Sequence, residues 1–384
     1  MLRERLSASL FALVISGALV SPALAKDGVE IGQDGIEASL GDGAVEIRLG
    51  GKIHFDGYAV DGEGEDYTGA DFRRARPDLR IEIADVLKIR VEREFTRTDQ
   101  WRNLYAEIEP VEGFTLRGGQ FNAPFGIEHL QSANTIPFAE RSLSAALAQD
   151  YALGIQAGYA ADRFTVKAAY VGNAIGGSNA GKGVAARATW LPVDRGKTKV
   201  HLGLAFDLRD FDNRDELRFS GRAGTRFADA VFQTDRLDDL RGRTGVSGEV
   251  AILRGPFAAQ AQYIRQWIDR DGKRTRKASA GHVQASWMVT GEDYRYSSSG
   301  GLPSGPRIED GKMGVELAAR FGWANADFVR DEGAKARALD LSAGLHLNGN
   351  LKLMLSAGRA WFGRRETGDR QARTTGVLRF VAAF

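Results

Sequence analysis

Cysteine is absent from this chain of 384 residues, which excludes disulfides and thiolate metal sites. After the N-terminal segment, no apolar run approaches the roughly 18 residues that a membrane helix needs. The formal net charge is only +2, whereas a nucleic-acid-binding domain is expected to carry a broad basic excess. If the chain lies in a membrane, only a closed β-barrel remains, because lipid offers no partner to an open sheet edge.

The first 25 residues are predicted to be a signal peptide, so the mature protein is exported. Arg3 and Arg5 give a positive start, residues 10–20 an apolar core too short to span a bilayer, and residues 23–25 a cleavage site of small residues. Residues 26–49 are interpreted as an N-terminal periplasmic arm. Residues 50–384 then form the predicted transmembrane barrel.

What the chain does contain is alternation of apolar and polar residues with a period of two. In residues 74–83, for example, Leu79, Ile81 and Ile83 oppose a face that carries Arg76 and Arg80. Segments of about ten such residues are typical of outer-membrane barrels, whereas sandwich strands are nearer five or six residues. About sixteen antiparallel strands are predicted, an even number, beginning near Gly50, Asp71, Val86, Gln100, Phe114, Ala152, Phe164, Gly183, Lys199, Thr244, Phe257, Lys277, Lys312, Arg337, Leu351 and Thr374.

One connection stands out by its length. After the strand that ends near Asn122, about thirty residues pass without another alternating run, and a loop that long between strands usually has a function. Because the surrounding strands predict a closed wall, residues 123–150 are expected to fold inward and constrict a pore. The C-terminal strand ends on Phe384 and resembles the signal that outer-membrane barrels present to the barrel-assembly machinery. The predicted location is therefore the bacterial outer membrane, in contact with its lipids.

Several segments together resemble the phosphate-selective porin O and P family. Three of them lie in the first half of the barrel, at residues 71–76, 119–128 and 140–143, and later stretches at residues 201–204, 257–263 and 286–292 agree in order and spacing. The resemblance implies a trimeric, anion-selective porin of sixteen strands that passes phosphate or polyphosphate. Small anions, phosphate and chloride, are therefore the expected partners, and no cofactor is expected. The resemblance also implies an arginine series leading to a lysine site at the constriction.

The arginine series is assigned to Arg218, Arg222 and Arg226, which lie in a stretch without acidic residues. Guanidinium groups are always charged and can grip phosphate in a bidentate manner. The alternative is a solvated loop, because acidic residues flank the stretch on both sides. Arg73 and Arg74 are further candidates, although adjacent strand residues face opposite ways and both reach the lumen only where the strand is irregular.

The chain departs from the family at the constriction itself. His129 stands where the family's phosphate site has a lysine, and an imidazole is mostly neutral at pH 7. Positive charge is instead expected from Arg307 and Lys312, at the end of a connection where the family contributes lysines from a folded-in turn. A weaker or broader anion preference follows.

Other functions remain open on the sequence alone. A general or cation-preferring porin would invert or abolish the selectivity, and a barrel with a plugged lumen would not conduct. The residue types that a hydrolase needs are present, with His201, His282 and His346 on polar strand faces and many serines, but no sequence motif marks a nucleophile. Five scattered histidines give no zinc spacing. We therefore predict a non-enzymatic channel without metal.

Overall fold

The computed structural model describes residues 28–32, 35–41, 43–62, 66–96, 100–177, 181–212, 216–328, 334–363 and 370–384. The predicted signal peptide lies outside these residues. Helical structure in the described part is limited to α2 (Ile127–Leu130) and η3 (Leu143–Leu147). None of the described helices is long and apolar enough to cross a membrane.

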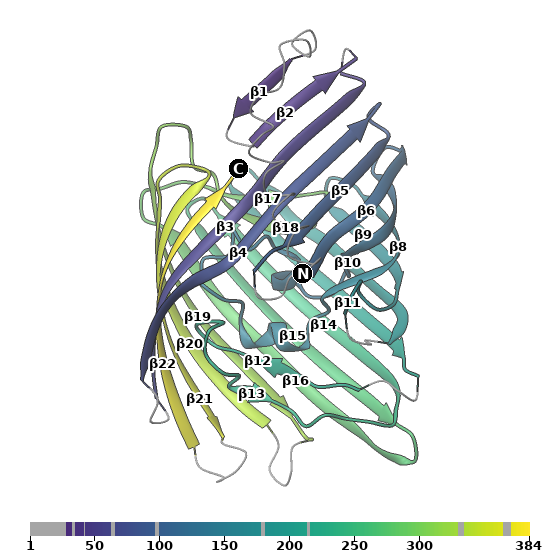
Figure 1. Ribbon diagram of the computed structural model, residues 1–384, viewed down its shortest axis with the longest axis vertical. Coiled ribbons are helices and arrows are strands. Elements are labelled where there is room, and N and C mark those ends of the chain that lie inside the picture. The colour runs from purple at the N-terminus through teal and green to yellow at the C-terminus, as the bar shows by residue number, and fades with distance from the viewer. Residues whose placement is uncertain are drawn as a thin grey trace, which may run out of the picture.

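Within the described residues, sixteen antiparallel strands form a closed wall, each paired with the next along the chain (Figure 1). The last strand closes on the first, with Thr374 opposite Asp61 and Ala383 opposite Lys52. This confirms the predicted all-β, antiparallel barrel of about sixteen strands. The wall strands are β3 (Val45–Asp61), β4 (Tyr67–Ile83), β5 (Leu87–Glu94), β6 (Gln100–Val111), β7 (Phe114–Asn122), β8 (Tyr151–Ala160), β9 (Phe164–Val171), β10 (Lys182–Arg195), β11 (Thr198–Asp210), β14 (Leu240–Arg254), β15 (Phe257–Arg270), β16 (Lys273–Met288), β19 (Gly314–Ala326), β20 (Ala334–His346), β21 (Leu351–Gly363) and β22 (Arg370–Ala383).

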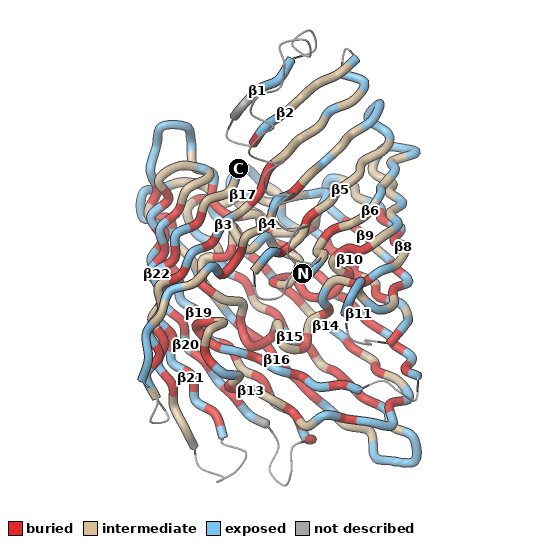
Figure 2. The backbone as a smooth tube through the Cα atoms, in the orientation of Figure 1, coloured by how far each residue is buried: buried red, intermediate tan, exposed pale blue. Residues whose placement is uncertain are grey.

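Apolar and polar residues occupy the opposite sides from those in a soluble protein. In β21 the buried positions include Lys352 and Ser356, whereas the alternate positions Leu353 and Leu355 are exposed. Figure 2 shows this alternation of buried and exposed residues along the wall. An apolar exterior around a polar interior is what a barrel embedded in lipid requires.

The strand boundaries agree closely with those predicted. Five of the predicted starts are the observed ones, namely Gln100, Phe114, Phe164, Phe257 and Leu351. The larger differences occur where strands are longer than expected, because β3 begins at Val45 and β14 at Leu240. The additional residues lengthen the sheet, and in β14 they include a register shift between Leu240 and Gly242.

Residues before Gly50 continue the sheet. β1 (Val29–Gly32) and β2 (Gly35–Leu40) form a hairpin, and β2 pairs with the first residues of β3, with Ile36 opposite Leu49. Figure 1 shows the hairpin standing beyond the barrel rim. The predicted division at Gly50 therefore falls inside a continuous strand, and the segment called an arm is a sheet extension at the end of the barrel that carries the short turns.

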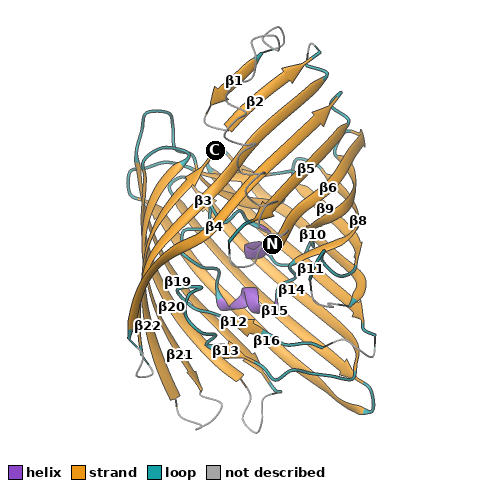
Figure 3. Ribbon diagram, in the orientation of Figure 1, coloured by secondary structure: helices purple, strands orange, loops and turns teal. Residues whose placement is uncertain are grey.

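Three connections fold into the barrel instead of running over its rim. The constriction loop, residues 123–150, carries α2 and η3, both of which lie inside the wall in Figure 3. The long loop, residues 211–239, contains β12 (Ser220–Gly221) and β13 (Phe232–Gln233). The inward turn, residues 289–313, contains the hairpin of β17 (Tyr294–Ser297) and β18 (Leu302–Pro306) and enters from the short-turn end.

Candidate functional site: a cationic chamber beside the constriction loop

The constriction loop leaves the wall directly after β7. Pro124 has no amide hydrogen and cannot continue the strand ladder, and Gly126 adopts a φ of 87°, which favours glycine. A Cβ on Gly126 would lie 2.9 Å from Nε2 of Gln262 on β15, so the loop reaches a distant part of the wall within its first turn. Phe125 and Ile127 are fully buried there. The predicted inward path of residues 123–150 is confirmed.

A buried carboxylate ties the loop to β19 and β20. Glu128 accepts hydrogen bonds from the amide nitrogen of Ser142 at 2.9 Å and from its Oγ at 2.6 Å. Nη1 of Arg320 on β19 donates to the same carboxylate at 2.8 Å, and Nη2 of Arg320 donates to Asp340 on β20 at 2.9 Å. The two halves of the loop and two wall strands thus share one network.

A second ionic anchor explains the orientation of Arg73 and Arg74. The register between β3 and β4 shifts after His54, which leaves Arg73 as the extra residue of a β-bulge. Both arginines consequently point inward. Arg73 binds both carboxylate oxygens of Glu140, and Nη1 of Arg74 lies 3.1 Å from Nδ1 of His54. Arg73 thus holds the loop directly, and Arg74 contacts it through His54, whose Nε2 lies 2.8 Å from Oδ1 of Asn134. Neither arginine lines the chamber described below.

Glu140 also interacts with the last wall strand. Nη2 of Arg379 on β22 lies 3.4 Å from its carboxylate, and Nη1 of Arg379 donates to the carbonyl of Ala139. Burial alone would raise the pKa of Glu140, but the guanidinium of Arg73 holds it well below its ordinary value of 4.5. The carboxylate remains charged at neutral pH, so the loop is fixed to β4 and β22.

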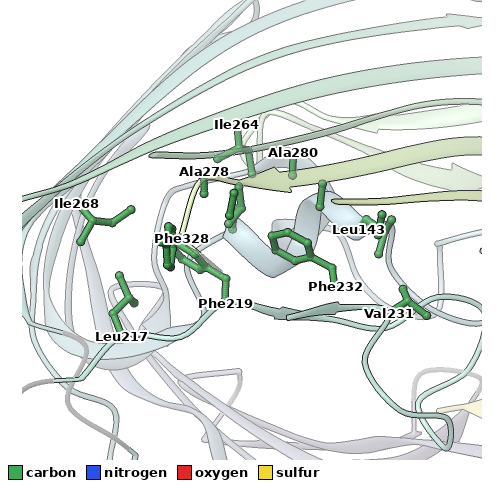
Figure 4. Close-up of a cluster of buried hydrophobic side chains, with 14 of the residues drawn as sticks. Leu143, Leu217, Phe219, Val231, Phe232, Ile264, Ile268, Ala278, Ala280 and Phe328 are labelled. Atoms are coloured by element: carbon green, nitrogen blue, oxygen red, sulfur yellow. The ribbon is translucent and has the colours of Figure 1, made fainter. Parts of the chain in front are cut away.

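An apolar cluster joins the constriction loop to the long loop. Leu143 and Leu147 of η3 pack with Phe219 and Phe232 of the long loop and with Ile264 on β15. Figure 4 shows this cluster between η3, the long loop and the inner wall. Burial of such side chains contributes about 1.5–3 kcal/mol each. The two inward segments therefore support each other.

The arginines of the long loop lie on its exposed face. Arg218 and Arg222 are exposed, whereas Leu217 and Phe219 beside them are buried against the wall side of the loop. Arg226 is partly buried, and the charges that act on it include Arg73 and Glu140. The structure therefore spreads Arg218, Arg222 and Arg226 along a segment that crosses the barrel interior.

The tip of the long loop contacts the opposite side of the barrel. Phe227 stacks on Tyr58 of β3, with ring centroids 4.6 Å apart. Nη1 of Arg373 on β22 donates to the carbonyl of Asp229 at 2.7 Å. The loop starts after β11, so it crosses the mouth of the barrel before it returns to β14.

A chamber of about 270 Å³ remains between the constriction loop and the wall strands β3 to β10. Among the described residues, its lining contains seven arginine or lysine side chains but a single carboxylate, that of Glu92. Neutral polar surface in the lining comes from Tyr105, Tyr151, Asn103, Asn122 and Gln156. The lining cations are Lys52, Arg76, Arg90, Arg117, Arg141, Lys167 and Arg187.

Most of these cations are held in place by a carboxylate or a backbone carbonyl. Arg141 donates from Nε and Nη2 to the carbonyls of three residues of the constriction loop. No hydrogen bond or ion pair of Lys167 occurs among the described residues. The five carboxylate pairs are Lys52 with Glu92 at 2.8 Å, Arg76 with Glu94 at 2.6 Å, Arg90 with Asp78 at 2.8 Å, Arg117 with Glu107 at 2.5 Å and Arg187 with Glu249 at 2.5 Å.

His129 is the one predicted site residue that lines the chamber. It lies in α2, and its Nε2 is 3.3 Å from Oδ1 of Asp150 at the end of the loop. Nη1 of Arg102 on β6 lies 3.6 Å from the same oxygen. The histidine thus contributes an imidazole beside a carboxylate at the position where the family resemblance implies a lysine.

Arg307 and Lys312 lie on the exposed part of the inward turn. Lys312 pairs with Glu309 at 2.6 Å, and neither cation lines the chamber. The turn instead contributes backbone, because Gly300 and Leu302 line the chamber. The structure does not bring the cations of this turn together with His129.

Two tyrosines hold the inward turn in the lumen. The hydroxyl of Tyr294 donates to the buried carboxylate of Glu316 at 2.8 Å, and the hydroxyl of Tyr296 lies 2.8 Å from Nδ1 of His201. Burial raises the pKa of Tyr296 to about 12, so its hydroxyl keeps its proton at neutral pH. The turn therefore narrows the exit below the constriction loop.

Sequence reasoning missed the seven lining cations as a group. Arg76 lies on a strand face that is predicted to be charged. Alternation along their strands could also have marked the inward side chains of Arg117, Lys167 and Arg187 as lumen residues. Nothing local to those strands shows which part of the lumen stays open. That depends on where the three inward segments lie.

The hydrolase alternative has two serine–histidine contacts among the described residues, both at His282. Oγ of Ser144 lies 2.9 Å and Oγ of Ser142 3.1 Å from Nδ1 of His282, but all three side chains are buried. The other ring nitrogen of His282 faces Gln260 at 3.3 Å, where a catalytic triad needs a carboxylate. Among the described residues, no group of three His, Asp or Glu side chains is placed to hold a metal ion.

Comparisons with known proteins agree with this geometry. The sequence profile of the family described as phosphate-selective porin O and P matches residues 45–380. No curated protein gives a significant sequence match. At 11–13% identity, the following likenesses to solved structures show the fold alone. One similar structure is an anion-selective porin from Comamonas acidovorans (TM-score 0.53, 13% identity, covering 88% of this chain and 100% of that chain). Another is the outer membrane channel DcaP of Acinetobacter baumannii (TM-score 0.54, 11% identity, covering 90% of this chain and 99% of that chain). A third is a trimer form of OmpT, an outer membrane protein of Vibrio cholerae (TM-score 0.52, 12% identity, covering 89% of this chain and 100% of that chain).

Proposed function

Because the chain belongs to the phosphate-selective porin O and P family and is an outer-membrane porin, we propose that it passes small anions of the phosphate class by passive diffusion through the cationic chamber. The observation that carries this proposal is the lining of the chamber, in which seven cations face one carboxylate. The protein supplies binding and a charged path, without cofactor or energy source.

The physical basis is focusing of the electric field. In a narrow channel with low-dielectric walls, fixed positive charges raise the local concentration of anions and repel cations. Conduction also requires each binding site to be weak enough to release the ion. Fixed arginines paired with carboxylates supply shallow attraction, which suits rapid passage.

The long loop extends this field toward the mouth. Arg218 and Arg222 are exposed, and Arg226 lies near Arg73 at the constriction. An entering anion therefore meets separate cations before the chamber. Arg307 and Lys312 are exposed on the inward turn and would act on anions at the opposite exit.

The protein is proposed to assemble as a homotrimer. The sheet extension continues into β4 and β5 with a row of aliphatic in-register neighbours, Ala38, Ile47, Ile81 and Ile89. Contiguous apolar surface outside lipid indicates a protein contact. Insertion is proposed to use the barrel-assembly machinery through Phe384, which directly follows the last strand at the short-turn rim.

Single-channel recording from the purified porin in a planar bilayer tests the proposal. Under a potassium chloride gradient we expect a reversal potential of the sign given by chloride, and added phosphate should reduce the chloride current in a saturable manner. A reversal potential of the opposite sign would establish a cation-preferring porin, and an unselective current a general porin. Failure to conduct would indicate a plugged barrel.

A further inference from the structure

Lys167 differs from every other cation of the chamber. It lies on β9 with its side chain toward the lumen, and its ammonium group makes no hydrogen bond or ion pair to any described residue. Five of the seven lining cations have a carboxylate partner, and Arg141 is bound by three backbone carbonyls. The charge of Lys167 alone is left for a mobile ion.

The neighbours of Lys167 on the wall concentrate positive charge around it. Arg187 on β10 lies directly opposite in register, and the other charges that act on Lys167 are those of Arg117 and Glu107. Like charges opposite each other across a strand pair are destabilising. An anion between them removes this repulsion.

The two arginines are fixed by other partners. Arg187 is bound by Glu249 and donates from Nη2 to the carbonyl of Gly301 at 2.8 Å. Arg117 is bound by Glu107 and stacks over the ring of Tyr105 at 4.1 Å. Their positions are rigid, whereas lysine has a flexible stem with three rotatable donors. Lys167 can therefore follow an ion for part of its passage.

The stem of Lys167 packs against the wall where its β8 partner has no side chain. That partner is Gly158, where a Cβ would lie 2.9 Å from Oγ1 of Thr115 and 3.4 Å from Cγ of Lys167. The chamber volume of about 270 Å³ is far above the roughly 10–15 Å³ that one water requires. A small oxyanion with part of its hydration shell fits there.

We propose that Lys167, flanked by Arg117 and Arg187, is the binding group for a small oxyanion of the phosphate class, so that the ion binds at the wall of the barrel and not at His129. This inference rests on the proposed anion-porin function. It assigns the site to three neighbouring inward positions on β7, β9 and β10. The ammonium group donates hydrogen bonds to the oxyanion, while the arginines fix the surrounding positive field.

The test is inorganic phosphate as a blocker of single-channel chloride current. Lys167→Gln should weaken the block about ten- to hundredfold, the effect of losing a charge-assisted hydrogen bond. Lys167→Arg keeps the charge. Phosphate should block this variant at a concentration within a few-fold of that for the wild type, which would also show that the position tolerates substitution. Lys182→Gln is the matched control, since this exposed lysine on β10 lies outside the chamber.

A double variant separates a local site from the general field. Lys167→Gln with Glu107→Gln restores the net charge but not the ammonium group, so the block should stay weak. Full recovery of the block in the double variant would overturn the assignment, and so would an unchanged block in Lys167→Gln. A wild-type channel that prefers cations would overturn the anion-porin function itself, and the site with it.

Discussion

At the scale of single residues, charge in this lumen is decided by partners more than by residue type. Arg73 and Glu140 are largely buried, with side chains 10% and 11% exposed, and hold a loop. Lys167 has no such partner among the described residues and faces the chamber. The exposed pair of Arg48 and Glu37 on the sheet extension neither holds a loop nor faces the chamber. Three basic residues of similar charge thus have three different roles.

The Glu140 anchor leads to a prediction about stability. Glu140→Gln removes the charge that the buried Arg73 and Arg379 share, and loss of one partner of a buried pair costs about 3–5 kcal/mol. We expect the free energy of unfolding to fall by about that amount. Guanidinium titration of the protein in phospholipid vesicles, followed by tryptophan fluorescence, measures it. Glu37→Gln, in an exposed pair, should change the free energy by at most about 1 kcal/mol.

The same anchor has a defined pH dependence. Because the pKa of Glu140 is lower in the folded than in the unfolded protein, its stabilisation is fully present above the ordinary value of 4.5. It is lost as the pH falls below 4.5 toward the folded pKa. The unfolding titration of the wild type should therefore show this contribution unchanged from pH 7 to pH 5 and a decline below. A decline of equal size in Glu140→Gln would assign the effect to other groups.

At the scale of elements, three inward segments share the lumen and leave one side open. The constriction loop and the long loop pack together over β15 and neighbouring strands through Leu143 and Phe232. The inward turn meets the constriction loop where Nε2 of Gln131 donates to the carbonyl of Pro303 at 3.3 Å. The open space remains against β3 to β10, which is why the cations of those strands line it.

The long loop supports a prediction about ion capture. Replacing Arg218, Arg222 and Arg226 together by Gln should lower the association rate of phosphate at least about tenfold, because fields of this kind raise association rates by roughly 10–10³. The dissociation rate should change less, since these residues lie outside the chamber. Fluctuation analysis of the chloride current separates the two rates.

The control for this variant is Arg274→Gln at the exposed start of β16, which should leave both rates unchanged. Unaltered ion selectivity and association in the triple variant would remove these three arginines from the conduction path. They would then be residues of a solvated loop, the alternative that their acidic flanks leave open.

At the scale of the whole molecule, the barrel separates two environments across one wall. Outward positions such as Leu204 and Leu355 are apolar and exposed, while inward positions such as Asp207 and Arg209 are charged and buried. Closure of β22 on β3 removes the open edges that lipid does not tolerate. The field of the lumen is therefore surrounded by low-dielectric material.

Selectivity that arises from such a field must depend on salt. The screening length falls from about 10 Å at 0.1 M ionic strength to about 3 Å at 1 M. We expect the ratio of anion to cation permeability, measured from reversal potentials, to decrease steadily between these concentrations. A ratio independent of salt would show that selectivity comes from direct contact at a narrow point, without a contribution from the distant arginines.

The sequence alone determined the barrel. Alternation with a period of two is a local property, and it was sufficient for sixteen strands, for the polar interior and for a long connection such as residues 123–150 that turns inward. The resemblance to a porin family agreed with the same segments. Even the irregularity required by Arg73 and Arg74 was visible as a conflict with strand geometry, and the β-bulge resolves it.

The tertiary structure decided which charges face the pore. The sequence predicts that Arg307 and Lys312 supply charge at the constriction, but both are exposed on the inward turn. Lys167, which the sequence did not single out, lines the chamber. The physical reason is that ion pairs form between residues distant in sequence, as Arg187 and Glu249 do. Most lining cations are neutralised by a paired carboxylate. Which cation stays unpaired, here Lys167, depends on strand register and on the paths of the three inward segments.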